Sequence, residues 1–172
     1  MVFLIRILEK TSTKVGLTVL FAVYAVVFGG LLKTLHELTK ASGGFGILDF
    51  DVGYSRERVL EVLGSYGETG MALYSRIQIL DLINPAVYST ILSSVIFLLW
   101  RNRNVDWVVA VPIIAGLLDY LENFTLFLLS KSFPDVSADL VTFSSSLSVI
   151  KTIALYTAVL VLILGAALRL RS

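Results

Sequence analysis

The chain has no cysteine and a single histidine, and few of its residues carry charge. Without cysteine it can form no disulfide, thiol redox centre, iron–sulfur cluster or cysteine-ligated zinc site. This also excludes a quinone-coupled thiol oxidase of the four-helix membrane type. The lone His36 and the lack of an H-E-x-x-H motif give little support to a catalytic metal. We therefore expect neither a metal site nor a cofactor.

Charged residues make up 16% of the 172 residues, whereas soluble domains have about 25%. The net charge is only +1, and no cluster of lysine and arginine exists to displace counter-ions from nucleic acid. We therefore expect no nucleic-acid partner. Hydrophobic residues account for 56% of the chain, although a soluble chain this short would need polar cover. This composition predicts a polytopic membrane protein.

Four segments are long and apolar enough to cross a hydrocarbon core, which takes about 20 helical residues. We place these spans at about 15–36, 75–100, 106–130 and 140–168. The predicted fold is all-α, an integral membrane four-helix bundle formed by residues 1–172 as a single domain. Residues 2–8 could form a short amphipathic helix on the membrane surface or a frayed extension of the first span.

The connection between the first two spans predicts a small extracytoplasmic helical cap over residues 45–72. Ser55 is a suitable N-cap for a short helix. Val59, Leu63 and Tyr66 would share one face of that helix and pack against the mouth of the bundle. From about Thr69, a second helix is expected to run directly into the second span.

The positive-inside rule gives an orientation. Arg101 and Arg103 occupy the link between the second and third spans, and Arg169 and Arg171 follow the fourth. The opposite link, residues 131–139, has one lysine and two aspartates. We therefore predict an integral, multi-pass membrane protein whose N- and C-termini are both cytoplasmic.

Polar residues recur at helical spacing on one face of the second, third and fourth spans. They are Tyr74, Gln78, Asp81, Asn84 and Tyr88 on the second span, Asp119, Glu122 and Asn123 on the third, and Ser144, Ser148 and Lys151 on the fourth. At ~1.5 Å per residue, every ionisable side chain among them falls in the outer half of its span. Such faces normally look into a bundle interior or a water-filled cavity.

The stripes predict a vestibule that opens to the outer side and is closed below. Lys151 would lie opposite Asp119 or Glu122, and Asp81 with Gln78 would form the entrance. Asp119, Glu122 and Lys151 are the candidate catalytic residues: the two carboxylates would be the acid/base or charge-binding groups, and the lysine their counter-charge. The other polar residues of the stripes are candidate ligand-binding residues.

Three acids against one or two bases leave surplus negative charge, which a proton, Arg76, a cation or a ligand would have to neutralise. A purely structural reading remains open as well, because a buried lysine–carboxylate pair can simply fix the register of two helices.

The functional hypothesis is a pocket that binds, and by acid/base chemistry transforms, a membrane lipid or another amphiphilic small molecule. One alternative is a non-catalytic accessory or assembly subunit of a larger membrane complex, with a membrane-protein partner or as a homo-oligomer. A second is an ion- or proton-coupled transporter, although no polar residue offers a path through the inner half. Whether the protein is an enzyme is left open by the sequence.

Overall fold

The computed structural model describes residues 2–101 and 106–170, and over these residues the chain is helical and contains no strand. The α-helices are α1 (Val2–Thr11), α2 (Lys14–Ala41), α3 (Arg56–Ser65), α4 (Gly67–Asp81), α5 (Asn84–Trp100), α6 (Ala110–Ser132) and α7 (Ala138–Leu170), with short 3-10 helices η1 (Leu48–Phe50) and η2 (Asp106–Val109). The prediction of an all-helical protein is confirmed. Arg103 and Arg171, used in the charge argument, lie outside the described residues.

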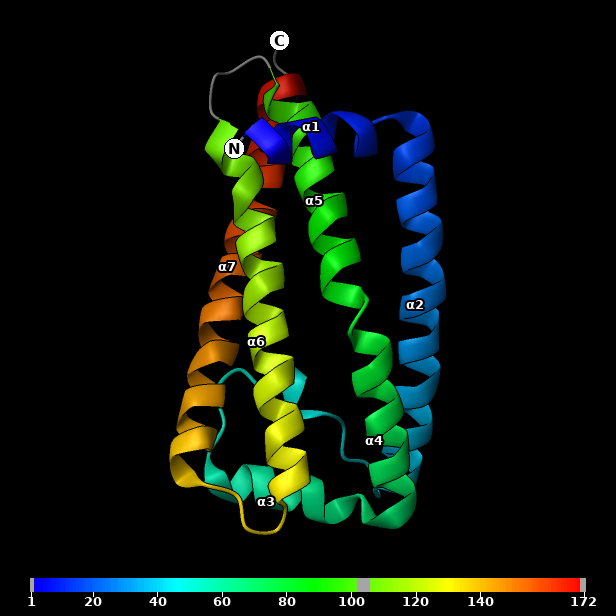
Figure 1. Ribbon diagram of the computed structural model, residues 1–172, viewed down its shortest axis with the longest axis vertical. Helices are drawn as coiled ribbons and strands as arrows, with labels where there is room; N and C mark the ends of the chain where they lie inside the picture. The colour runs from blue at the N-terminus through cyan, green and yellow to red at the C-terminus, as the bar shows by residue number, and fades with distance from the viewer. Residues whose placement is uncertain (1, 102–105, 171–172) are drawn as a thin grey trace.

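Four helical segments are long and apolar enough to cross a membrane: Lys14–Ala41, Gly67–Trp100, Trp107–Ser132 and Ala138–Leu170. They run lengthwise beside one another, with α6 packed along α7 and α5, and α2 packed along α4 and α5 (Figure 1). Both termini lie at one end of the molecule, called here the terminal end. Helix α3 lies across the other end, called here the capped end.

Helix α1 is a separate helix that lies across the terminal end, so the alternative of a frayed extension of the first span is wrong (Figure 1). Thr13 caps the start of α2 by accepting a hydrogen bond from the Gly16 amide. Thr11 and Ser94 share a 2.7 Å hydrogen bond that fixes α1 to α5. The side chain of Leu8 is fully buried among apolar residues of α5 and η2. The terminal end is therefore closed by packed apolar side chains.

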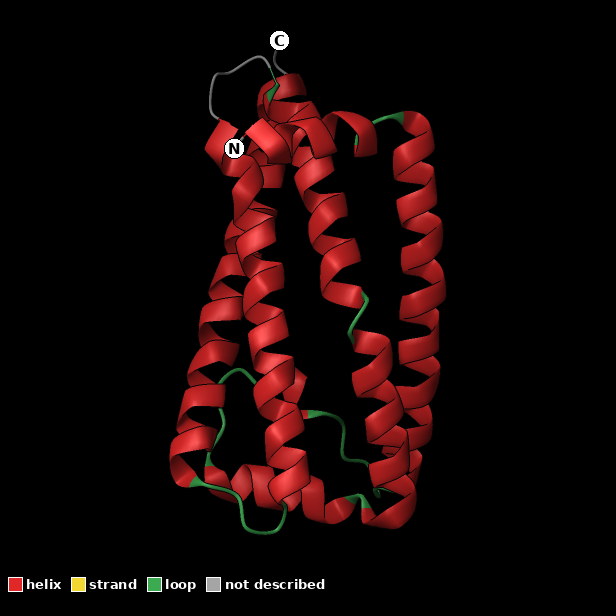
Figure 2. Cartoon of the chain, viewed as in Figure 1, coloured by secondary structure: helices red, strands yellow, loops and turns green. Residues whose placement is uncertain are grey.

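The second span is interrupted between α4 and α5, although the sequence predicts one continuous helix there. Figure 2 shows a short non-helical link between α4 and α5, at Leu82 and Ile83. Pro85 accounts for this break, because proline lacks an amide hydrogen and its ring clashes with the carbonyl four residues earlier, that of Asp81. The Tyr120 hydroxyl donates a 2.8 Å hydrogen bond to the Leu82 carbonyl, one of the groups that the break leaves free.

Helix α3 forms as predicted at the capped end. The Ser55 hydroxyl accepts a hydrogen bond from the Arg58 amide and so caps the helix. Val59, Leu63 and Tyr66 are all buried in the apolar core at this end, as their common face predicted. Helix α4 begins directly afterwards, at Gly67, which has a φ of +56°.

The rest of the predicted cap is different from the expectation. Residues 47–54 do not cover the end of the helices but fold back between them (Figure 1). Tyr54 and Asp51 contact Ser145 and Ser148 of α7, and Ser148 lies ten residues beyond the start of α7, or ~15 Å along its axis. We call residues 47–54 the inserted segment.

Helices α5 and α6 approach each other closely beside the break. A Cβ placed on Gly116 would lie 2.8 Å from the Ser89 hydroxyl oxygen and 3.1 Å from the Pro85 carbonyl oxygen. The absence of a side chain at Gly116 therefore sets the separation of the two helices at this level.

Replacing Gly116 with alanine should lower the free energy of unfolding by about 1–3 kcal/mol, the usual cost of overpacking. Gly29→Ala in α2 is the matched control, because a Cβ there meets nothing within 4 Å. That control should be neutral or stabilising by up to about 1 kcal/mol, since alanine favours helix. Unfolding followed by tryptophan fluorescence in mild detergent measures both variants. Equal stabilities would contradict the close approach of α5 and α6.

Candidate functional site

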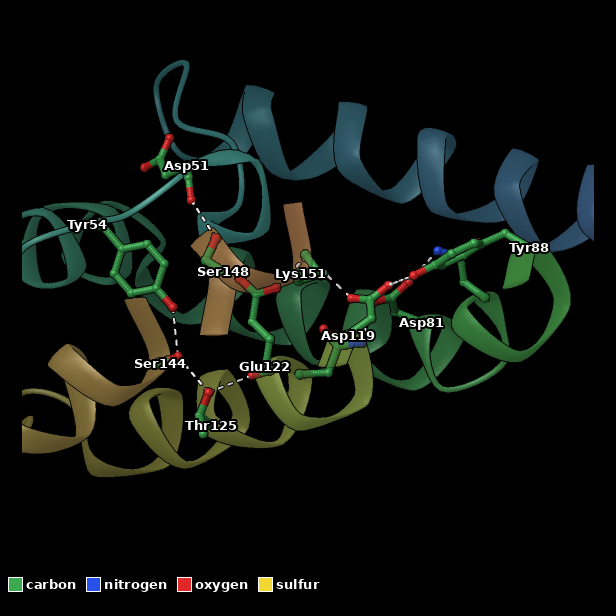
Figure 3. Close-up of polar contacts among 12 residues, drawn as sticks. Asp51, Tyr54, Asp81, Tyr88, Asp119, Glu122, Thr125, Ser144, Ser148 and Lys151 are labelled. Carbon is green, nitrogen blue, oxygen red and sulfur yellow. Dashed lines mark hydrogen bonds and ion pairs between the residues drawn. The ribbon is translucent and has the colours of Figure 1, made fainter. Parts of the chain in front are cut away.

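Lys151 of α7 lies against two carboxylates of α6 (Figure 3). Its Nζ is 3.3 Å from Asp119 Oδ1 and forms a second ion pair with Glu122 Oε2. The sequence predicted a pairing with one or the other, and the structure contains both. The three-residue spacing of Asp119 and Glu122 explains this, because it places both side chains on the face of α6 that packs on α7.

The two carboxylates have different surroundings. Glu122 is fully buried, and its Oε1 has no hydrogen-bond partner among the described residues. Asp119 is 7% exposed, and its Oδ2 accepts a 2.9 Å hydrogen bond from the Tyr88 hydroxyl. Lys151 is thus the only described residue that forms an ion pair with Glu122, whereas Asp119 also has the Tyr88 hydroxyl as a partner.

Asp81 lies at the end of α4, directly before the break. Its two oxygens accept hydrogen bonds from the side-chain amides of Asn84, at 2.9 Å, and Asn123, at 2.7 Å. No described lysine or arginine forms an ion pair with it. Arg76, considered as a neutralising partner, is exposed on α4 and forms no ion pair with any described residue.

Asp49 is a fourth carboxylate in this region, and sequence reasoning did not nominate it. It belongs to η1 and is partly buried, and Lys151, Asp119 and Asp81 all lie within electrostatic range of it. Burial raises the pKa of the Asp49 carboxyl and the negative charge of Asp119 adds to this effect, while the positive charge of Lys151 opposes it. The sequence does contain a signal that this segment is buried, because the apolar side chains of Ile47, Leu48 and Phe50 around Asp49 are unusual for a surface loop.

Ser144 and Ser148, expected to bind a ligand, instead contact the inserted segment (Figure 3). The Ser148 hydroxyl donates a 2.9 Å hydrogen bond to the Asp51 carbonyl. The Ser144 hydroxyl shares a 2.7 Å hydrogen bond with the Tyr54 hydroxyl, and the Tyr54 amide donates to Ser145 Oγ at 2.8 Å. The serines of α7 therefore hold the segment that carries Asp49.

A cavity of about 600 Å³ lies among α2, α5 and α7, beside this group of charges. Its walls are mostly apolar and include Phe28, Leu32 and Leu35 of α2, Ile91 and Leu92 of α5, and Leu155 of α7. One end is polar. This polar end of the cavity is formed by Asp49, Asp81, Asn84, Tyr88, Asp119 and Lys151.

The cavity opens at the side of the molecule. Phe21 and Leu32 of α2 and Tyr156 of α7 all line it, and yet each is at least half exposed. The opening therefore lies between α2 and α7, and its rim is apolar. This is different from the expected vestibule open at the outer end, because the inserted segment occupies the space at the capped end.

The remaining nominated residues lie behind the cavity. Tyr74, Gln78 and Asn123 surround a much smaller space of about 10 Å³, and Tyr74 packs on Tyr66 in the core. Glu122 lies on the far side of Lys151 and is not part of the cavity wall. The structure therefore brings five of the eleven nominated residues to the wall, and Asp49 joins them.

Among the described residues, no three histidine, aspartate or glutamate side chains come close enough to hold a metal ion.

Comparison of the chain with models of known protein families, with curated proteins and with solved structures finds no match. Function is therefore inferred from the geometry of the site.

Lys151→Met should lower the free energy of unfolding by about 3–5 kcal/mol, because it leaves two buried carboxylates without a counter-charge. Adding Glu122→Gln should recover more of the loss than adding Asp119→Asn, since Asp119 keeps Tyr88 as a partner. The exposed Lys33 of α2 offers a control, and Lys33→Met should cost less than about 0.5 kcal/mol. Denaturant unfolding in detergent gives the double-mutant cycles. Coupling below about 0.5 kcal/mol in both would rule out the pairing.

Asp49→Asn should make the protein more stable at neutral pH. The folded chain holds the Asp49 proton to a higher pH than the unfolded chain, whose carboxyl has its ordinary pKa of 3.8. The cost of ionising Asp49 is thus absent in acid and grows as the pH rises from 3.8 through the raised folded pKa. Melting temperatures from about pH 4 to 8 should diverge between wild type and variant. Asp139→Asn, at an exposed position, is the control, and its melting temperatures should follow those of wild type across this pH range. The same result for Asp49→Asn would show that Asp49 is solvated.

Proposed function

We propose that the chain is an integral, four-span membrane protein with both termini in the cytoplasm and the capped end on the outer side. The four long apolar helices support insertion, and their outward side chains include exposed, large apolar residues such as Val26, Phe124 and Ile153. Arg101 and Arg169 lie at the terminal end, which favours the cytoplasmic side for that end. Helix α1 would then lie at the inner membrane surface.

Within the membrane, the cavity would bind a lipid-like or other amphiphilic small molecule. The observation that carries this proposal is the form of the cavity: it is apolar along its walls, charged at one end and open between α2 and α7. Its volume of about 600 Å³ falls within the usual range for small-molecule sites, ~300–1,000 Å³. A ligand would enter sideways from the hydrocarbon region, with its polar group directed to the charged end.

The polar end also has groups suited to acid/base chemistry. Asp119 faces the cavity and receives hydrogen bonds from Tyr88 and Lys151. A carboxylate in this position could take a proton from a bound molecule, while Lys151 keeps the resulting charges balanced. Ionisable residues inside a membrane are functional candidates by default. Proton transfer on the bound amphiphile is therefore the reaction class we propose, with Glu122 as the second partner of Lys151.

Transport is less well supported. Between the cavity and the terminal end, the interior is filled by the buried apolar side chains of Leu8, Ile96 and Val109. A transported ion would have to cross this apolar layer, and none of these side chains could coordinate it.

Native mass spectrometry of protein extracted gently from its own membrane tests the binding proposal. Wild type should retain a small molecule, and Leu155→Trp should lose it because the indole would fill the cavity. Ile153→Trp is the matched control, since Ile153 is exposed on the same helix and does not line the cavity. Equal retention in all three proteins, or a stoichiometric protein partner in place of a ligand, would contradict the proposal.

The same preparation tests the proposed chemistry through Asp119→Asn. This variant should retain a ligand that differs from the one in wild type, in mass or in chromatographic retention of the isomer, because the reaction would stop at the substrate. An identical ligand in both proteins would argue for binding without catalysis.

A further inference from the structure

The polar end of the cavity is rich in acceptors. Asp49, Asp81 and Asp119 present carboxylate oxygens there, and Asn84 Oδ1 is a buried acceptor without a hydrogen-bond partner among the described residues. Unpaired buried acceptors are costly, and buried native polar atoms are usually satisfied. The acceptor atoms at this end of the cavity therefore outnumber the donors.

The donors already present have partners within the protein. The Lys151 ammonium is held between Asp119 and Glu122, and the Tyr88 hydroxyl donates to Asp119. The amide of Asn84 donates to Asp81. Each of these donors is thus engaged by a carboxylate of the protein, and only one of the three N–H groups of Lys151 and one of the two of Asn84 remain.

Charge leads to the same conclusion. Four carboxylates belong to this cluster, those of Asp49, Asp81, Asp119 and Glu122, against the single ammonium of Lys151. Lys151 is shared by two of them, which leaves Asp49 and Asp81 with no cation among the described residues. Uncompensated carboxylates away from water are strongly unfavourable. A ligand that brings a positive charge would remove this cost, whereas an anionic ligand would increase it.

We propose that the amphiphile bound in this cavity has a protonated amine as its headgroup, with the N–H groups directed to Asp49, Asp81 and Asn84. This inference rests on the proposed function, since it assigns a chemical class to the occupant of the same cavity. The apolar chain of the ligand lies along α2. The cavity-lining residues of α2 run from Phe21 to Leu35, fourteen residues or ~21 Å, which is enough for a long alkyl chain.

The proposal is tested with three probes of equal chain length, namely dodecylamine, dodecanol and dodecanoate. The full chain is placed in phosphatidylcholine nanodiscs, and the affinity of each probe is measured by titration with native mass spectrometry. We expect dodecylamine to bind at least ten-fold more tightly than dodecanol, and dodecanoate to bind most weakly.

Asp81→Asn and Asp49→Asn, made separately, should each reduce the preference for the amine over the alcohol several-fold. Asp139→Asn removes an exposed carboxylate that does not line the cavity and should leave the preference unchanged, which controls for general attraction of the amine to negative charge. Leu155→Trp should weaken the binding of the amine and the alcohol alike, because it fills the space for the chain.

The results separate the two proposals. If the alcohol or the carboxylate binds as tightly as the amine, and Leu155→Trp abolishes that binding, the amine is the wrong class but the cavity is a ligand site. A preference for the amine that survives both Asp81→Asn and Asp49→Asn also overturns the amine assignment. If Leu155→Trp changes the binding of none of the probes, the proposed function fails as well.

Discussion

The arrangement of the helices around the polar interior depends on the ammonium group of Lys151. Lys151 joins α7 to α6 through Asp119 and Glu122, and both carboxylates are buried. Helix α6, fixed in this way, directs two further side chains toward the broken span, Asn123 to the Asp81 carboxylate and Tyr120 to the Leu82 carbonyl. The polar interactions of the second span thus follow from the position of α6. A lysine with two partners can balance only one of them, so the same interaction that orders the helices leaves the site with surplus negative charge.

Two departures from regular helix bring that charge to the cavity. The break before Pro85 turns Asp81 and Asn84 toward the interior, and the inserted segment carries Asp49 there from the capped end. Non-helical backbone at membrane depth is tolerated only where protein or a cavity surrounds it, and discontinuous spans often mark ligand sites. Asp81 also lies at the carboxyl end of α4, where the helix dipole disfavours a negative charge. The break in the second span, the inserted Asp49 carboxylate and the position of Asp81 at the end of α4 are each unfavourable for stability. Apolar residues would stabilise the fold better, so these features are easier to understand as requirements of ligand binding than of folding.

The sequence predicted the helices well, because long apolar segments and helical periodicity are local signals. The same periodicity placed Asp119 and Glu122 toward Lys151. The sequence did not predict features that depend on contacts between distant chain segments. Asp49 lies at the cavity only because serines of α7 hold the inserted segment there by hydrogen bonds. Pro85 is a local signal as well, and its effect on the preceding turn predicts the break, although we expected one continuous helix there. The sequence did not predict the side opening either, because the opening arises where α2 and α7 both pack on α5 but make little contact with each other.

A cavity that opens between α2 and α7 would face the hydrocarbon of a membrane and not water at the capped end. The accessibility of a nitroxide label at Leu155, in phosphatidylcholine bilayers, distinguishes the two, and the absence of native cysteine makes Leu155→Cys a unique labelling site. A label on Asp135, exposed in the link between α6 and α7, gives the reference for an aqueous position. We expect oxygen, which dissolves in lipid, to relax the label at Leu155 strongly, and a water-soluble nickel chelate to relax it little. Relaxation by the chelate as strong as at position 135 would show a water-filled vestibule and rule out an opening to hydrocarbon.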